Sequence, residues 1–364
     1  MARYALGIDI GGTFTDIVVY DHESGAQFNR KVLTTPDDPG RGVMAGIDQL
    51  LGEDGLAPED FARVVHATTL FTNALITRQG AKTGLITTEG FRDVLEIQRE
   101  RKFELYDIFL EKPRPLVPRP LRKEVRERLA ADGTPVIPLD TVGLLRVADE
   151  LVAAGCEAVA IVFLHAYANP AHEAAAARLI MARHPALFLS TSHEVSPQIR
   201  EYDRASTTVV NAFVKPLAQR YLDHLGQEIA GRRIPAPFFL MLSNGGLTHV
   251  GEAQRTPVQL IESGPAAGAL AAAFFGTREG DQRVLAFDMG GTTAKLSVVD
   301  DGEPLVAYGF EAAREKRFIE GSGLPISISA IELIEIGAGG GSLARVDTLG
   351  LLKVGPESAG SVPG

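Results

Sequence analysis

The stretch Gly7-Ile8-Asp9-Ile10-Gly11-Gly12-Thr13-Phe14-Thr15-Asp16, followed by Ile17-Val18-Val19-Tyr20, decides the fold of this chain of 364 residues. Its pattern predicts an apolar strand with one carboxylate, a turn of glycines and threonines, and a second strand. Glycines let backbone N–H groups approach an anion closely because no Cβ blocks the way. A carboxylate directly before such a turn suits a hydrated divalent cation beside a phosphate. The stretch therefore predicts a loop that binds phosphate and a metal ion.

The same pattern returns at residues 285–299, Leu-Ala-Phe-Asp-Met-Gly-Gly-Thr-Thr-Ala-Lys-Leu-Ser-Val-Val. Asp288 corresponds to Asp9, and Gly290-Gly291-Thr292 corresponds to Gly11-Gly12-Thr13. One turn of this kind, met alone, is no more than a tight hairpin. Its repetition predicts two related domains whose equivalent loops face each other across a cleft.

The composition is that of an ordinary globular protein, with 45% apolar and 23% charged residues. Lysine and arginine number 36, and aspartate and glutamate number 46, which gives a formal net charge of −10. This charge argues against nucleic acid or an anionic membrane as the main partner. The apolar runs fall short of the ~20 residues that a membrane-spanning helix needs. The single cysteine, Cys156, lies in an apolar run and is expected to be buried, and we expect a cytoplasmic protein.

Strands and helices alternate along the chain, which predicts an α/β architecture with domains at residues 1–190 and 200–364. The proline-rich segment 99–128 reads as an ordered surface excursion, within which Tyr106, Ile108, Phe109 and Leu110 need burial. Apolar runs predict strands at 28–33, 81–87, 157–164, 187–190, 237–242 and 331–336. Periodic patterns predict helices at 40–51, 70–78, 90–98, 141–154, 170–184 and 201–225, the last interrupted at Pro216.

A third glycine-rich stretch, Ile336-Gly337-Ala338-Gly339-Gly340-Gly341-Ser342, follows the last of these strands. Glycines remove side chains where a backbone must pack against something flat, such as a base or a ribose. Little sequence follows this cluster to close a second domain. We therefore expect the second domain to be truncated.

The two repeated loops and the glycine cluster resemble the phosphate-1, phosphate-2 and adenosine motifs of the actin/hexokinase/Hsp70 ATPase superfamily. The chain is more closely similar to the hydantoinase/oxoprolinase family, A-type subunit (N-methylhydantoinase A and acetone carboxylase beta type). The resemblance is carried, beside residues 7–16, by His-Ala-Thr-Thr (66–69), Thr-Gly-Leu-Ile-Thr-Thr-Glu-Gly-Phe-Arg-Asp (83–93), Ser-His-Glu-Val (192–195), Arg-Glu-Tyr-Asp-Arg-Ala-Ser-Thr-Thr-Val-Val-Asn-Ala (200–212), Ser-Asn-Gly-Gly-Leu (243–247), Gly-Pro-Ala-Ala-Gly (264–268) and residues 336–342.

This resemblance implies two related actin-like, ribonuclease H-like domains that flank a nucleotide cleft, with ATP and Mg²⁺ as cofactors. It implies ATP-dependent hydrolysis of a cyclic amide (a hydantoin, oxoproline or a lactam) through phosphorylation of the amide oxygen. An ATP-dependent ketone carboxylase of the acetone or acetophenone type is the first alternative. A small-metabolite kinase and a nucleotide-switched binding protein of the same superfamily are further alternatives. The expected partners are the small-molecule amide or ketone and a B-type subunit.

Two positions depart from the pattern of many hydantoinase-type members. Those members continue the second loop as Gly-Gly-Thr-Ser-Thr-Asp, whereas Lys295 stands here where that aspartate would be. Many also carry Asp-x-His before the glycine cluster, and this chain has no histidine there. Both variants resemble the branch that contains ketone carboxylases and lactam hydrolases.

The resemblance and the repeat together nominate the site residues. Asp9, Asp16, Asp288 and Lys295 are the candidate catalytic residues, with Asp9 and Asp288 as metal ligands. Asp16 either orients the attacking group or a metal-bound water, or caps a turn. Lys295 either neutralises phosphoryl charge or is a solvated strand residue. The candidates for nucleotide binding are glycines and threonines: Gly11, Gly12, Thr13, Thr15, Gly290, Gly291, Thr292, Thr293, Gly337, Gly339, Gly340 and Gly341.

Three other features have plainer interpretations. His66 is read as a structural residue at a strand end before it is read as a substrate contact. His193 stands beside Glu194, but no third ligand lies at a spacing that zinc could use. The helix that opens at Gly264-Pro265 either faces the nucleotide or simply follows a turn.

Overall fold

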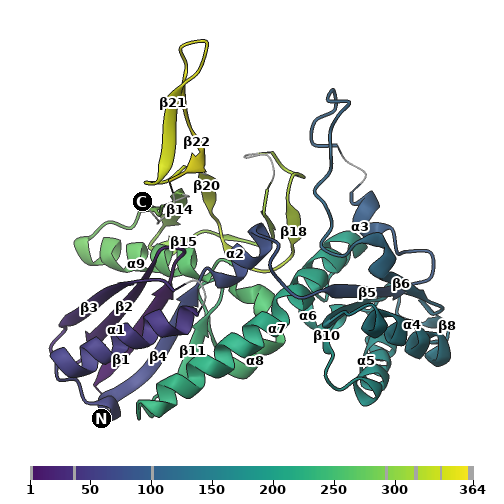
Figure 1. Cartoon of the computed structure of the whole chain (residues 1–364), viewed down its shortest axis with the longest axis horizontal. Coiled ribbons are helices and arrows are strands. Elements are labelled where there is room, and N and C mark those ends of the chain that lie inside the picture. The colour runs from purple at the N-terminus through teal and green to yellow at the C-terminus, as the bar shows by residue number, and fades with distance from the viewer. Residues whose placement is uncertain are drawn as a thin grey trace.

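The computed structural model describes residues 3–35, 38–99, 102–291, 294–314, 319–336 and 338–359. It shows a mixed α/β protein in which the long helix α7 (Glu201–Gly231) runs between two sheets (Figure 1). The predicted α/β class is confirmed. Within these residues, none of the helices has the length and apolar character to cross a membrane.

The first sheet contains the opening stretch of the sequence. Its strand order is β12-β11-β4-β1-β2-β3. β1, β2 and β3 form an antiparallel meander, and β4 and β11 run parallel to β1. Helix α1 (Pro39–Glu53) covers this sheet with Val43, Ile47 and Leu50, and Asp38 caps it by accepting from Gly40 N. The strands are β1 (Tyr4–Ile10), β2 (Phe14–Asp21), β3 (Gln27–Leu33), β4 (Phe61–Thr68), β11 (Phe238–Met241) and β12 (Leu247–His249).

The second sheet is inserted between β4 and β11 and is entirely parallel. Its order is β10-β9-β5-β6, and every residue of β5 and β9 is buried. This burial explains why the sequence shows continuous apolar runs here, and it includes the neighbouring Cys156. The elements are β5 (Thr83–Thr88), α3 (Val94–Ile97), β6 (Arg122–Val125), α4 (Thr141–Ala153), β9 (Ala158–Val162), α5 (Ala171–Arg183) and β10 (Phe188–Thr191).

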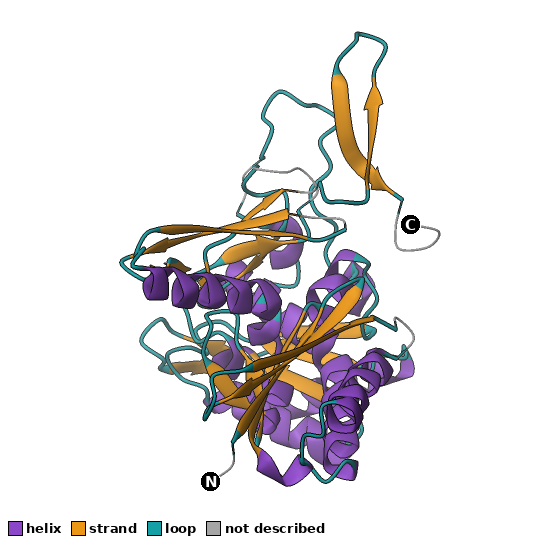
Figure 2. Ribbon diagram, turned by 90° about the vertical axis from the view of Figure 1, so that its left-hand side faces the viewer, coloured by secondary structure: helices purple, strands orange, loops and turns teal. Residues whose placement is uncertain are grey.

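The second Gly-Gly-Thr loop belongs to a smaller sheet on which helix α9 (Ser263–Glu279) packs. Its strands are β13 (Val284–Met289), β14 (Ala294–Asp300), β15 (Glu303–Pro304) and β20 (Ile334–Ile336). A hairpin of β21 (Ser342–Val346) and β22 (Leu352–Ser358) extends away from the rest of the chain (Figure 2). Because β11 pairs with β4 and carries β12 at the sheet edge, the first sheet contains strands from both predicted domains, and the domain boundary stays a prediction.

Several element predictions were wrong in detail. Helix α7 continues through Pro216 to Gly231, because Ala212, Phe213 and Pro216 are buried and the packing on both sides holds the turn that proline weakens. The predicted helix at 90–98 is reduced to α3, since Gly90 takes a φ of +86° in a turn. The strand predicted at 331–336 is two strands, β19 (Ala330–Ile331) and β20, which pair with different neighbours.

The prediction that the loop around Tyr106 needs burial was also wrong. Tyr106 is 97% exposed, and Ile108 and Phe109 are each 85% exposed. An apolar side chain would gain free energy from burial, but this loop projects from the fold and leaves these side chains exposed to solvent.

The remaining elements are η1 (Pro58–Asp60), α2 (Leu70–Ile76), η2 (Arg119–Leu121), β7 (Arg128–Leu129), β8 (Pro135–Ile137), α6 (Ser192–Val195), α8 (Val250–Arg255), η3 (Pro257–Leu260), β16 (Val306–Ala307), β17 (Phe310–Ala312) and β18 (Leu324–Ile326).

Candidate nucleotide site

The two Gly-Gly-Thr loops meet. A Cβ built on Gly291 would lie 3.5 Å from Oγ1 of Thr13, so the loop of β13–β14 touches the loop of β1–β2. The internal register of the two hairpins is also the same. Asp9 is opposite Asp16 in β1–β2, and Asp288 is opposite Lys295 in β13–β14. The two similar stretches of sequence therefore form two hairpins of the same strand register.

Hydrogen bonds to the end of β3 fix the first loop. Gly11 N donates to Phe14 O at 2.9 Å, and a Cβ on Gly11 would lie only 3.1 Å from that oxygen, so the turn needs a glycine. Thr34 Oγ1 donates to Gly11 O at 2.9 Å, and Thr34 N donates to Thr13 O at 2.9 Å. Thr15 is fully buried, with Oγ1 at 3.1 Å from Oγ1 of Thr34. Thr15 thus contributes to the shape of the loop, while Gly12 is exposed at its tip.

Asp9 is a carboxylate of the site whose charged form is disfavoured by its surroundings. Its Oδ1 is buried and has no hydrogen-bond partner among the described residues. Burial raises the pKa of Asp9 to about 6, with further contributions from the negative charges of Asp16 and Asp288. Asp16 itself is half exposed and forms an ion pair with Lys31 at 3.0 Å. A cation placed among these carboxylates would relieve both the repulsion and the missing partner.

The second loop is backed by the third glycine-rich stretch. Gly340 N donates to Gly290 O at 2.9 Å, and Gly341 N donates to Gly291 O at 2.8 Å. Gly339 N donates to Oγ of Ser342 at 2.9 Å, which closes the turn. The predicted residues Thr292, Thr293 and Gly337 lie outside the described residues. The glycine cluster, although distant in sequence, is therefore hydrogen-bonded directly to the second loop.

Lys295 is neither solvated nor free. Its Nζ lies 2.6 Å from Oε2 of Glu262, the residue that precedes α9. Asp288, Lys295 and Ser297 from the sheet line a depression of about 250 Å³ with Gly268 and other small residues of α9. Sequence reasoning missed Glu262, although its position directly before a glycine-proline helix start was a signal for a side chain at the loop.

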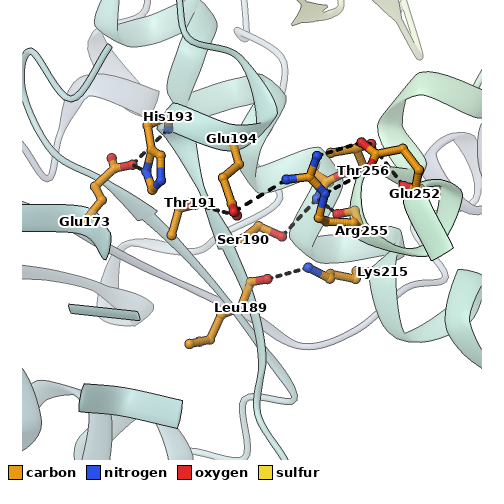
Figure 3. Close-up of polar contacts among 11 residues, drawn as sticks. Glu173, Leu189, Ser190, Thr191, His193, Glu194, Lys215, Glu252, Arg255 and Thr256 are labelled. Carbon is orange, nitrogen blue, oxygen red and sulfur yellow. Dashed lines mark hydrogen bonds and ion pairs between the residues drawn. The ribbon is translucent and has the colours of Figure 1, made fainter. Parts of the chain in front are cut away.

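His66 and His193 have hydrogen-bond partners outside the Gly-Gly-Thr loops. His66 is buried, with Nε2 at 2.9 Å from Tyr221 Oη and Nδ1 at 3.2 Å from Ile8 O, so the structural interpretation is confirmed. His193 points to Glu173, with Nδ1 at 2.8 Å from Oε2, while Glu194 accepts from Thr191 (Figure 3). Among the described residues, no three His, Cys, Asp or Glu side chains lie close enough together to hold a metal by themselves. Mg²⁺ commonly uses one or two carboxylates together with phosphates and waters, which fits Asp9 and Asp288.

Comparison with known protein families identifies the chain. A model described as the hydantoinase/oxoprolinase N-terminal region matches residues 5–183, and a second model described as hydantoinase/oxoprolinase matches residues 204–364. The chain belongs to the hydantoinase/oxoprolinase family. The two matches include residues 7–16 and residues 336–342, two of the motifs on which the resemblance rests.

Individual relatives agree with this family. The chain is 42% identical to an uncharacterized protein of Methanocaldococcus jannaschii, over 99% of the chain and 53% of that protein. It is 36% identical to the caprolactamase subunit alpha of Pseudomonas jessenii, over 100% of the chain and 51% of that subunit. Its fold matches the nucleotide-free structure of acetone carboxylase with a TM-score of 0.84 at 27% identity, covering 99% of this chain and 52% of the other. The chain thus spans about half the length of the relatives that it matches.

Proposed function

We propose that this chain is the nucleotide-binding part of an ATP-dependent enzyme that hydrolyses a cyclic amide. The observation that carries the proposal is the contact between two equivalent Gly-Gly-Thr loops beside Asp9, whose buried Oδ1 has no hydrogen-bond partner among the described residues. The relationship to a caprolactamase subunit favours a lactam or another cyclic amide as the substrate class.

The residues of the site fit Mg²⁺ and ATP. Asp9 and Asp288 would hold the metal, directly or through water, because Asp9 is destabilised by burial and by its acidic neighbours. Backbone N–H groups of the two loops would hold the phosphates. Gly339, Gly340 and Gly341 lie against the second loop and would leave room for the adenosine.

ATP would supply the phosphoryl group that turns an unreactive amide oxygen into a leaving group. The residues of this chain would bind the phosphates and orient the reacting groups. Lys295 keeps an ammonium group opposite Asp288, where it would balance phosphate charge. Asp16, half exposed near the start of β2, would orient the attacking water.

A ketone carboxylase is the second candidate, because the acetone carboxylase structure matches nearly the whole chain. A carboxylase needs the same phosphate site, so these loops do not separate the two activities. In either case we expect a B-type subunit as the partner and a cytoplasmic location.

The test measures ADP release by the full-length protein with its partner subunit. A lactam, hydantoin or oxoproline should raise ATP consumption, whereas acetone or acetophenone with bicarbonate should not. The reverse pattern would establish the carboxylase instead. Asp9→Ala and Asp288→Ala should each abolish the substrate-dependent ADP release, and full activity in either variant would refute the site.

A further inference from the structure

Helix α9 begins at the point where the two loops come together. The three consecutive residues Glu262, Ser263 and Gly264 each contact a different part of the site. The Glu262 side chain reaches Lys295 on the strand of the second loop. Ser263 and Gly264 reach the ends of β4 and β1, beside the first loop.

The Glu262–Lys295 pair is closely held. The two charged groups are 2.6 Å apart, and each side chain is only 12% exposed. Glu335 is the next carboxylate, at 4.0 Å from the same Nζ, and its side chain is half exposed. Burial lowers the pKa of Lys295, but the negative charges of Glu262, Glu335 and Asp288 outweigh burial and hold the pKa above its ordinary value. The ammonium therefore stays charged.

Ser263 and Gly264 join this pair to the first loop. Ser263 Oγ accepts from Thr68 N at 3.0 Å and donates to Thr68 O at 3.1 Å. Thr68 is the register partner of Ile10 at the end of β1. A Cβ on Gly264 would lie 3.2 Å from Oδ1 of Asp9. The start of α9 thus contacts both Asp9 in the hairpin β1–β2 and Lys295 in the hairpin β13–β14.

A buried ion pair is a poor device for stability alone. Removing two charges from water costs about as much as their attraction returns, and apolar side chains of similar size often stabilise as well or better. A lysine also has a long flexible side chain, and fixing its ammonium in one place has an entropic cost. A carboxylate in this position therefore points to a requirement for the ammonium at a defined place.

We propose that Glu262 is a positioning residue that holds the Lys295 ammonium for the phosphates, and that the segment Glu262–Gly264 fixes the second loop against Asp9. This inference rests on the proposed nucleotide site. Phosphates bound between the loops would then meet an ammonium that is already held in place, beside the carboxylates of Asp9 and Asp288.

The test compares two carboxylates near the same lysine. Glu262→Gln keeps the size of the side chain and removes its charge, and Glu335→Gln is the matched control. ATP affinity in the presence of Mg²⁺ is measured by titration calorimetry on the full-length protein, with the melting temperature as a second readout. We expect Glu262→Gln to weaken ATP binding roughly tenfold and Glu335→Gln to change it less than about twofold.

A double variant separates positioning from folding. Lys295→Met should weaken ATP binding as Glu262→Gln does, and Glu262→Gln/Lys295→Met should bind ATP no more weakly than Lys295→Met alone. If Glu262→Gln lowers only the melting temperature and binds ATP like Glu335→Gln, the positioning role is wrong while the nucleotide site stands. If the unaltered protein binds no ATP, the proposed function fails, and this inference fails with it.

Discussion

Asp288 lies directly opposite Lys295 in β13–β14, at the position where β1–β2 sets Asp9 opposite Asp16. The two hairpins have the same strand register, but they differ in the charges of their side chains. Lys295 forms an ion pair with Glu262, whereas the Oδ1 of Asp9 has no hydrogen-bond partner in the part of the chain that the structure describes. The uncompensated negative charge therefore lies in the hairpin β1–β2, where a bound cation would stabilise the protein most.

Asp9→Asn should stabilise the metal-free protein above pH 6. The unfolded chain loses the Asp9 proton near its ordinary pKa of 3.8, whereas the folded protein keeps it to about pH 6. Stability is thus lost as the pH rises through this window, by about 2–3 kcal/mol for a single group. Urea unfolding at pH 4 and pH 8 should show the variant more stable only at pH 8. Mg²⁺ should stabilise the wild type and not the variant.

The exposed Asp300 provides the control for this measurement. Asp300→Asn should follow the wild-type pH profile within about 0.5 kcal/mol. An Asp9→Asn protein that is less stable than the wild type at pH 8 would show that Asp9 already has a partner.

Gly264→Ala should disturb Asp9 directly. The new Cβ would lie 3.2 Å from Asp9 Oδ1 and 3.4 Å from Thr69 Cγ2, so one of them must move. We expect a loss of about 1 kcal/mol or more in the free energy of unfolding, and weaker ATP binding. In α7, a Cβ on Gly226 would meet no described atom within 4 Å outside the backbone of its own helix and its chain neighbours, so Gly226→Ala should instead stabilise by about 0.5–1 kcal/mol. Equal effects of the two substitutions would argue against the close packing of Gly264.

His66→Gln should reduce the acid sensitivity of the fold. Burial lowers the pKa of His66 to about 4, against an ordinary value of 6.5. The unfolded chain therefore binds this proton first, and stability is lost as the pH falls from 6.5 to 4, by about 3 kcal/mol. The difference in unfolding free energy between wild type and variant should shrink over that window. The exposed His22→Gln should leave the profile unchanged, and a constant difference for His66→Gln would contradict the buried neutral state.

Glu173→Gln should destabilise the protein strongly. The buried carboxylate accepts from Phe163 N, Ser192 Oγ, His193 N and His193 Nδ1 at 2.6–2.9 Å (Figure 3 shows the histidine pair). An amide would place its own donor against these donors, at a cost of about 2–4 kcal/mol in thermal or urea unfolding. Glu194→Gln, at a half-exposed position, should cost less than about 1 kcal/mol. The hydrogen bond that Glu173 accepts from His193 Nδ1 also raises the pKa of His193, so Glu173→Gln should change how the stability depends on pH.

The local backbone structure of the candidate site could be predicted from nearby sequence. The Gly-Gly-Thr turns, the carboxylates before them and the α/β class follow from patterns within a few residues, and a repeat of such a pattern is hard to produce by chance. The contact partners could not be predicted in this way. Lys295 and Glu262 are 33 positions apart and meet only because α9 packs on β14.

The sequence by itself determined that two equivalent loops exist, because backbone conformation at glycines is a local property. It also determined the family, through short motifs in a fixed order. Only the tertiary structure decided that Lys295 is a largely buried ion-pair partner, that Asp9 Oδ1 has no hydrogen-bond partner among the described residues, and that Tyr106 is exposed. Burial and charge pairing depend on which distant segments share a surface, and in the opening stretch they bury the Asp9 carboxylate and raise its pKa.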